Sequence, residues 1–102
     1  MRIDSRLYNG VLYVNLSGEL DEYNASLAKD KLDDMFNKAG FNQIVIDLSE
    51  LDFMDSTGIG MLIGRYKKMK VVNKKMYVCN PSKHVDRIFK MTGLYEIMPL
   101  IA

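Results

Sequence analysis

Residues 44–48 constrain the fold most, because they form a run of Ile, Val, Ile, Asp and Leu that is almost entirely apolar and β-branched. Such a run is typical of a central strand that is covered on both faces. Residues 49–54 lead from it to Asp, Ser, Thr and Gly at 55–58, where a helical period of apolar residues begins. A buried strand that leads directly into a helix predicts an α/β fold with parallel strand pairs.

The spacing of apolar residues predicts three helices. The first runs from about 22 to 39, with Asp21 as a plausible N-cap and Gly40 at a C-terminus that favours positive φ. The second spans about 58–73 and the third 81–93. The apolar face predicted for the third helix consists of Val85, Ile88, Phe89 and Met91.

The remaining segments are predicted to be strands. Residues 2–17 read as a hairpin, because Asn-Gly at 9–10 is a strong turn signal, and Gly18 is expected to end its second strand. Residues 75–79 form another strand, and 95–98 a short last one. The order predicts one small α/β domain over residues 1–102, with a mixed sheet of four to five strands and three to four helices packed on it.

Composition excludes several classes of function. The chain has 102 residues and a net charge of +1, which gives no reason to expect nucleic acid or an anionic membrane as a partner. One cysteine, Cys79, and one histidine, His84, allow neither an intrachain disulfide nor a structural zinc site. No apolar stretch approaches the roughly 20 residues of a membrane span, and the N-terminus lacks the apolar core of a signal peptide. We therefore expect a cytoplasmic protein with no metal and no cofactor.

The segment that points to function is 53–60, which follows the buried strand and opens the second helix. The simplest interpretation makes Asp55 or Ser56 an N-cap, worth about 1 kcal/mol. However, Asp, Ser and Thr occur together, and two glycines follow close to the helix start, where each costs up to about 1 kcal/mol relative to alanine. Bare backbone at Gly58 and Gly60 would let another molecule approach. The segment therefore predicts a phosphorylation site at Ser56, because a phosphate is tolerated at a helix N-terminus.

Five segments together resemble the STAS domain, the family of anti-sigma factor antagonists. They are residues 44–48 and 53–60, residues 18–21 ahead of the first helix, and residues 64–67 and 91–94, which look most like the sporulation branch that opposes the anti-sigma-F factor. The resemblance covers essentially the whole chain. It implies a non-enzymatic switch that acts through other proteins.

The resemblance also implies a cycle and a set of site residues. The unphosphorylated protein would bind an anti-sigma factor that is also a serine kinase and so free the sigma factor. The kinase would then phosphorylate Ser56, and a dedicated phosphatase would reset the protein. Thr57 stands where many relatives have serine or alanine, so a second hydroxyl is available. The residues expected at the partner surface are Asp21, Asp55, Thr57, Gly58, Ile59, Gly60 and Met61.

Alternatives remain at this point. The chain could be a STAS module of another sigma-factor or stress-response branch, acting as a scaffold or sensor. The chain could also be one half of a dimeric aspartic protease. This is disfavoured, because residues 55–58 are one residue too long for the Asp-Thr-Gly or Asp-Ser-Gly motif and a helical pattern follows. A nucleotide-binding protein is disfavoured, because neither dinucleotide nor P-loop glycine spacing is present.

Two single residues also have simple interpretations. Met61 lies off the apolar stripe of its helix and is predicted to be either a scattered exposed residue or an interface contact. Cys79 is predicted to be a buried small hydrophobic residue.

Overall fold

The computed structural model of the chain describes residues 1–101. Strands and helices alternate in it as the sequence predicted, which confirms the α/β class. The elements in chain order are β1 (Arg2–Tyr8), β2 (Val11–Leu20), α1 (Ala25–Phe36), β3 (Gln43–Met54), α2 (Ser56–Val71), β4 (Lys75–Cys79), α3 (Lys83–Thr92) and the 3-10 helix η1 (Leu94–Glu96).

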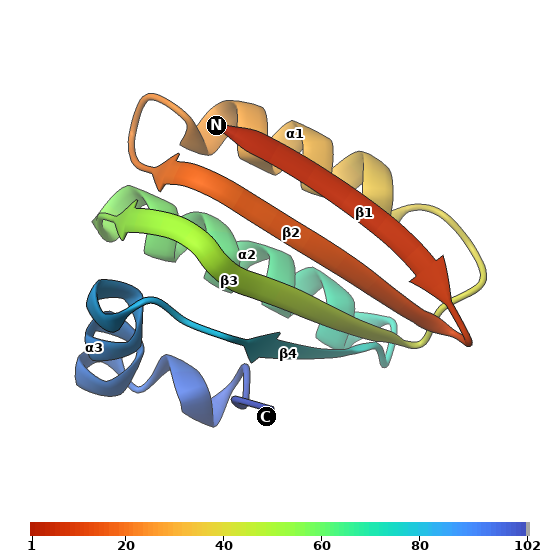
Figure 1. Cartoon of the computed structure of the whole chain (residues 1–102). Helices are drawn as coiled ribbons and strands as arrows, with labels where there is room; N and C mark the ends of the chain where they lie inside the picture. The colour runs from red at the N-terminus through yellow and green to blue at the C-terminus, as the bar shows by residue number, and fades with distance from the viewer. Residues whose placement is uncertain (102) are drawn as a thin grey trace.

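The four strands form one mixed sheet in the order β1-β2-β3-β4 (Figure 1). β1 and β2 are antiparallel and are joined at Asn9 and Gly10, both of which have positive φ as a tight hairpin turn requires. The pairs β2–β3 and β3–β4 are parallel. Since all three parallel strands point the same way, the segments after β2, β3 and β4 emerge at one edge of the sheet, and this edge carries the candidate site.

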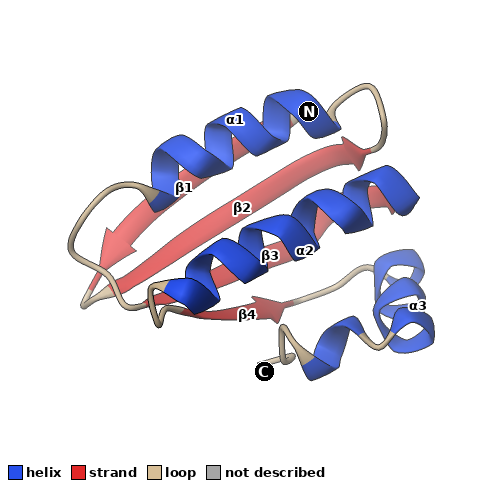
Figure 2. Cartoon of the chain, turned by 180° about the vertical axis from the view of Figure 1, so that it is seen from behind, coloured by secondary structure: helices blue, strands red, loops and turns tan. Residues whose placement is uncertain are grey.

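Helices α1 and α2 lie side by side on one face of the sheet (Figure 2). Their apolar residues meet cross-strand rows in the core: Leu12, Ile44 and Met76 form one row, and Val14, Ile46 and Val78 the next. Within residues 1–101 the opposite face of the sheet carries no helix (Figure 1). Val45, which points to that face, is only 6% exposed, so β3 is buried on both faces there as predicted, although helices cover only one of them. The backbone of β3 is also central, because strands flank it on both sides.

The end of β2 and both ends of α1 differ from the prediction. Gly18 does not end β2: the strand continues to Leu20, and Gly18 occupies an irregular register position with φ 108°, which glycine accepts readily. Helix α1 is shorter than predicted at both ends. At its start the carboxylate of Asp21 accepts a hydrogen bond from the Asn24 N–H at 3.0 Å, and this turn replaces the first helical turn.

The C-terminal part also departs from the prediction. Residues 95–98 form no strand, because Gly93 adopts a left-handed conformation (φ 74°) and leads directly into η1. Extended pairing occurs two residues later, where Leu100 forms an isolated parallel bridge with Val78. Met91 is 79% exposed and does not belong to the apolar face of α3, whereas Val85 and Phe89 are buried.

Candidate functional site

Asp55 organises the junction between β3 and α2. It is the N-cap of α2, and its Oδ1 accepts a hydrogen bond from the Gly58 N–H at 2.9 Å. Its Oδ2 accepts a second one from the Glu22 N–H at 3.1 Å, which ties the segment after β2 to the start of α2. The backbone N–H of Asp55 donates to the Leu20 carbonyl at 3.3 Å. Of the two N-cap candidates in the sequence, the structure therefore selects Asp55.

Ser56 therefore does not cap the helix. It is the first residue of α2 and is exposed, as is its neighbour Thr57. The first turn of α2 contains no acidic side chain, so only the capping carboxylate of Asp55 opposes the positive end of the helix dipole there. A hydroxyl in this position can be reached by another protein, and added negative charge meets a helix N-terminus.

Asp21 lies at the same edge, where it holds the turn that leads into α1. Its carboxylate and its carbonyl both accept from the Asn24 N–H, at 3.0 and 3.1 Å, and the N-cap position itself falls to Asn24. Asp21 is half-buried and directly precedes Glu22, whose backbone N–H donates to the Asp55 carboxylate. The predicted site residues that the structure leaves exposed or half-exposed at this edge are Asp21, Asp55, Ser56, Thr57, Ile59 and Gly60.

Two predicted surface residues are buried instead. A Cβ on Gly58 would lie 2.1 Å from the carbonyl oxygen of Leu20, so the fold itself requires glycine there, and the interpretation of Gly58 as backbone open to a partner was wrong about its exposure. Met61 is only 8% exposed and belongs to the core, although both interpretations of the sequence placed it on the surface. By contrast, a Cβ on Gly60 would meet nothing within 4 Å, so Gly60 remains open.

Two exposed aromatic side chains near this edge were not singled out from the sequence. Tyr23, in the segment after β2, is 88% exposed. Phe53, near the end of β3, is 39% exposed, and its ring stacks on His84 at a centroid distance of 5.3 Å. The alternation of the strand could have indicated Phe53, because Met54 beside it faces the core. Only the tertiary structure brings His84 to it.

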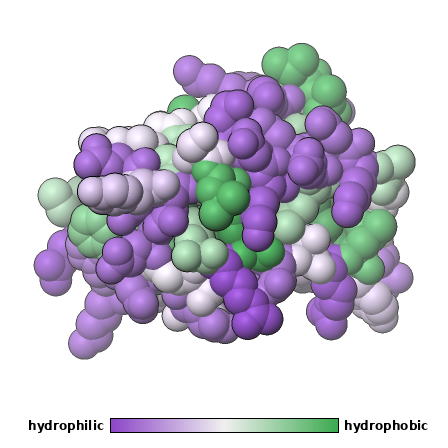
Figure 3. All heavy atoms as spheres, turned by 90° about the horizontal axis from the view of Figure 1, so that it is seen from above, coloured by the Kyte–Doolittle hydropathy of each residue, from purple (hydrophilic) through white to green (hydrophobic). Residues whose placement is uncertain are grey.

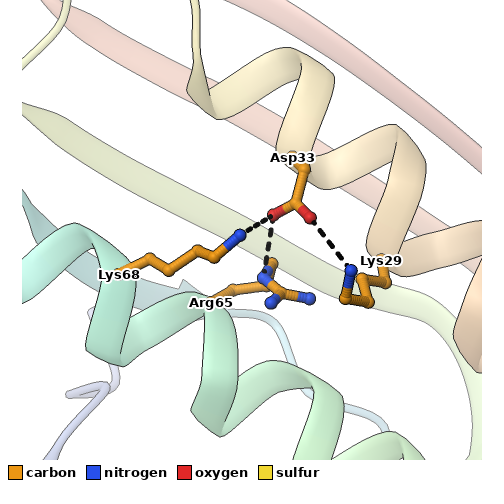
Figure 4. Close-up of polar contacts among 4 residues, drawn as sticks. All are labelled: Lys29, Asp33, Arg65 and Lys68. Carbon is orange, nitrogen blue, oxygen red and sulfur yellow. Dashed lines mark hydrogen bonds and ion pairs between the residues drawn. The ribbon is translucent and has the colours of Figure 1, made fainter.

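An ionic cluster joins α1 to α2 (Figure 4). The carboxylate of Asp33 lies 3.0 Å from Arg65 Nε, 3.4 Å from Lys68 Nζ and 3.6 Å from Lys29 Nζ. Arg65 is almost fully buried, whereas both lysines are exposed. Sequence reasoning used Arg65 only as part of a family motif and missed this contact, because Asp33 and Arg65 are 32 positions apart along the chain.

Other chemistry finds little support in the described part of the chain. No group of three His, Cys, Asp or Glu side chains within residues 1–101 could hold a metal ion. Cys79 is half-buried rather than fully buried, and burial together with the charge of Asp47 raises the pKa of its thiol, which disfavours the reactive thiolate. None of the helices over residues 1–101 is long and apolar enough to cross a membrane. Seen from above, the surface is mainly hydrophilic, with apolar side chains in separate small patches (Figure 3).

These features define a small α/β domain whose candidate site is an exposed hydroxyl on a capped helix start. The chain belongs to the STAS domain family, whose model matches residues 2–102. It is 37% identical over 100 residues to the "Anti-sigma F factor antagonist" of Paenibacillus polymyxa, covering 98% of this chain and 86% of that protein. It is also 30% identical to the "Anti-sigma-B factor antagonist" of Staphylococcus aureus, covering 96% and 90%.

Solved structures share the fold. The anti-sigma factor antagonist SpoIIAA in its unphosphorylated form superposes with a TM-score of 0.80 at 24% identity, covering 99% of this chain and 89% of that one. The Bacillus cell fate determinant SpoIIAA in the phosphorylated form superposes with a TM-score of 0.73 at 24% identity, covering 99% and 92%. The described fold is therefore that of the family, over almost the whole length of these proteins.

Proposed function

We propose that this protein is a cytoplasmic anti-sigma factor antagonist whose activity is switched off by phosphorylation of Ser56. The unphosphorylated form binds an anti-sigma factor with serine kinase activity and so frees the sigma factor. The kinase then modifies Ser56, and a phosphatase reverses the modification. Support comes from the named relatives, and the observation that carries the proposal is the exposed Ser56 hydroxyl at the first position of α2.

The local geometry explains why the fold would tolerate the phosphate. A phosphoserine carries roughly −1.5 to −2 charges at pH 7. At the start of α2 this charge meets free backbone N–H groups and the positive end of the dipole, which stabilises it by about 0.3–1 kcal/mol at an exposed position. The cap depends on Asp55 and not on Ser56, so the modification leaves the hydrogen bonds of the junction in place.

The same charge would oppose the partner. A phosphate held against an apolar or acidic partner surface loses hydration and is repelled. Asp21 and Asp55 already make this edge acidic, so the phosphate adds to a negative charge that is already present. Two like unit charges about 4 Å apart repel by about 4 kcal/mol at an effective dielectric of about 20. That energy corresponds to a loss of affinity of roughly a thousandfold. Phosphorylation would therefore release the partner without unfolding the domain. In this arrangement Thr57, Ile59 and Gly60 contribute surface, while Gly58 and Met61 act from beneath by packing.

The test is phosphate incorporation from labelled ATP by the cognate anti-sigma factor kinase. We expect Ser56→Ala to abolish incorporation and Thr57→Ala, its matched neighbour, to retain it. Label that stays on Ser56→Ala would assign the acceptor elsewhere. In calorimetry Ser56→Asp should keep the fold and weaken binding to the kinase; an unchanged affinity would contradict the electrostatic account.

A second candidate keeps the same fold in a different branch. The similarity to an anti-sigma-B factor antagonist supports this second candidate, which is a stress-response module that acts as a scaffold or sensor. Binding of purified anti-sigma-F-type and anti-sigma-B-type factors, measured side by side, distinguishes the two. Preference for the anti-sigma-F type would support the sporulation branch.

A further inference from the structure

A groove of about 340 Å³ runs between α1 and α2 and begins next to Ser56. Thr57, the residue after Ser56, lines its near end. The other residues of its lining that matter here are Ser26 and Lys29 from α1 and Gly60, Gly64 and Arg65 from α2. The groove is thus continuous with the edge that the proposed function assigns to the partner.

Arg65 places a buried positive charge in this groove. The residue is 5% exposed, and its only ionic contact within residues 1–101 is from Nε to Asp33, at 3.0 Å. The angles at this contact do not meet those of a hydrogen bond, so the Nε–H has no hydrogen-bond partner in the described chain. The terminal nitrogens of the guanidinium point away from Asp33 (Figure 4). Buried charges are normally paired and hydrogen-bonded, and a guanidinium has five N–H donors, so Arg65 has donors to spare.

The charge around the groove is unbalanced in the same direction. Three cations, Lys29, Arg65 and Lys68, surround the single carboxylate of Asp33. Of these charged residues, the cations Lys29 and Arg65 line the groove and the carboxylate of Asp33 does not, so the groove is positive beside a site whose other edge is acidic. The electrostatic complement of the groove is therefore an anion.

The glycines show that the groove has room for a group from outside. A Cβ on Gly60 or on Gly64 would meet nothing within 4 Å. Packing inside the domain therefore requires neither glycine, although each costs about 1 kcal/mol of helix stability relative to alanine. This contrasts with Gly58, where Leu20 leaves no space for a Cβ.

We infer that the groove receives an acidic side chain, aspartate or glutamate, from the protein partner that docks over Ser56, with its carboxylate bound by Arg65 and Lys29. This inference rests on the proposed function and adds the chemistry of the partner. A carboxylate matches the planar fork of a guanidinium and can accept two of its N–H groups. A protein side chain is favoured over a free anion, because the groove opens onto the partner edge. The partner surface thus has two requirements. It must tolerate Asp21 and Asp55, and it must provide an acidic residue that reaches past Thr57 into the groove.

The test measures the affinity of the unphosphorylated full chain for the purified anti-sigma factor by calorimetry at two salt concentrations. Lys29→Glu should weaken binding by about tenfold or more, because it replaces the attracting charge by a repelling one. Lys31→Glu is the matched control: it makes the same charge change on α1 at an exposed residue outside the groove, and should leave the affinity nearly unchanged. Gly64→Leu should weaken binding by about tenfold by filling the groove.

Arg65→Gln should weaken binding by roughly 30-fold or more, and Arg65→Lys should recover part of the loss. Urea unfolding of each variant checks that the domain is folded, and Lys29→Glu, at an exposed position, supplies the test if Arg65→Gln is unstable. Equal affinities of Lys29→Glu and Lys31→Glu, with normal binding by the wild type, would overturn the groove inference alone. A wild-type chain that does not bind the anti-sigma factor at all would overturn the proposed function as well.

Discussion

Gly58→Ala should destabilise this domain, although alanine is a better helix former than glycine. The Cβ of an alanine at this position would lie 2.1 Å from the carbonyl oxygen, 3.0 Å from the carbonyl carbon and 2.9 Å from the Cγ of Leu20. Ordinary contact begins at 3.4 Å, so the start of α2 and the end of β2 would have to separate by about 1 Å or more. The obstacle is mainly backbone, which cannot rotate away as a side chain can.

The magnitude follows from two opposing terms. Replacing glycine by alanine inside a helix gains about 1 kcal/mol. Overpacking costs about 1–3 kcal/mol and occasionally more, and a contact with backbone belongs at the upper end. The separation would also lengthen the hydrogen bond from the Asp55 N–H to the Leu20 carbonyl, now 3.3 Å. We expect a net loss of about 2 kcal/mol in the free energy of unfolding, and a fall in Tm of roughly 10 °C for a domain of this size.

The assay is urea denaturation followed by circular dichroism, with the slope m checked for constancy. Gly60→Ala is the matched control, two positions further along α2, where the added Cβ meets nothing within 4 Å. That variant should be more stable than the wild type by up to about 1 kcal/mol. A Gly58→Ala protein that unfolds at the same urea concentration as Gly60→Ala would refute the packing argument.

Three further predictions concern the end of β4 and the helices that follow it. Ser82→Ala should lower stability by about 1 kcal/mol in urea, because Ser82 caps α3 and its hydroxyl donates to the Leu51 carbonyl at 3.0 Å; an unchanged midpoint would contradict this. Tyr95→Phe should destabilise the domain at pH 7, because the hydrogen bond from Tyr95 lowers the pKa of Asp86. The hydrogen bond contributes its full stability above the pKa that Asp86 has in the unfolded chain, and this contribution is lost as pH falls through the lower pKa of Asp86 in the folded chain. The free energies of unfolding of Tyr95→Phe and wild type, measured in urea, should therefore become more similar in acid. Since its pKa is raised, Cys79 should react with a thiol reagent at pH 7 more slowly in the folded than in the urea-unfolded chain; equal rates would show an accessible thiolate.

Much of the site was readable from the sequence, because it is built from local signals. Asp, Ser and Thr in succession after a β-branched run predict an N-cap with spare hydroxyls, and the structure assigns the cap to Asp55 and leaves Ser56 exposed. The meaning of the glycines was not readable. Gly58 and Gly60 lie two residues apart and read alike, yet one faces the end of β2 and the other faces open space.

Local periodicity and turn chemistry determined the element order, the α/β class and the position of the hydroxyl that begins α2, because these depend on residues within a few positions of one another. The tertiary structure alone decided which of the site residues are surface and which are core, and it alone brought Asp33 of α1 to Arg65 of α2. Those outcomes depend on how two helices are placed on one sheet, and the burial of a residue on a helix follows from that placement rather than from its own sequence neighbours.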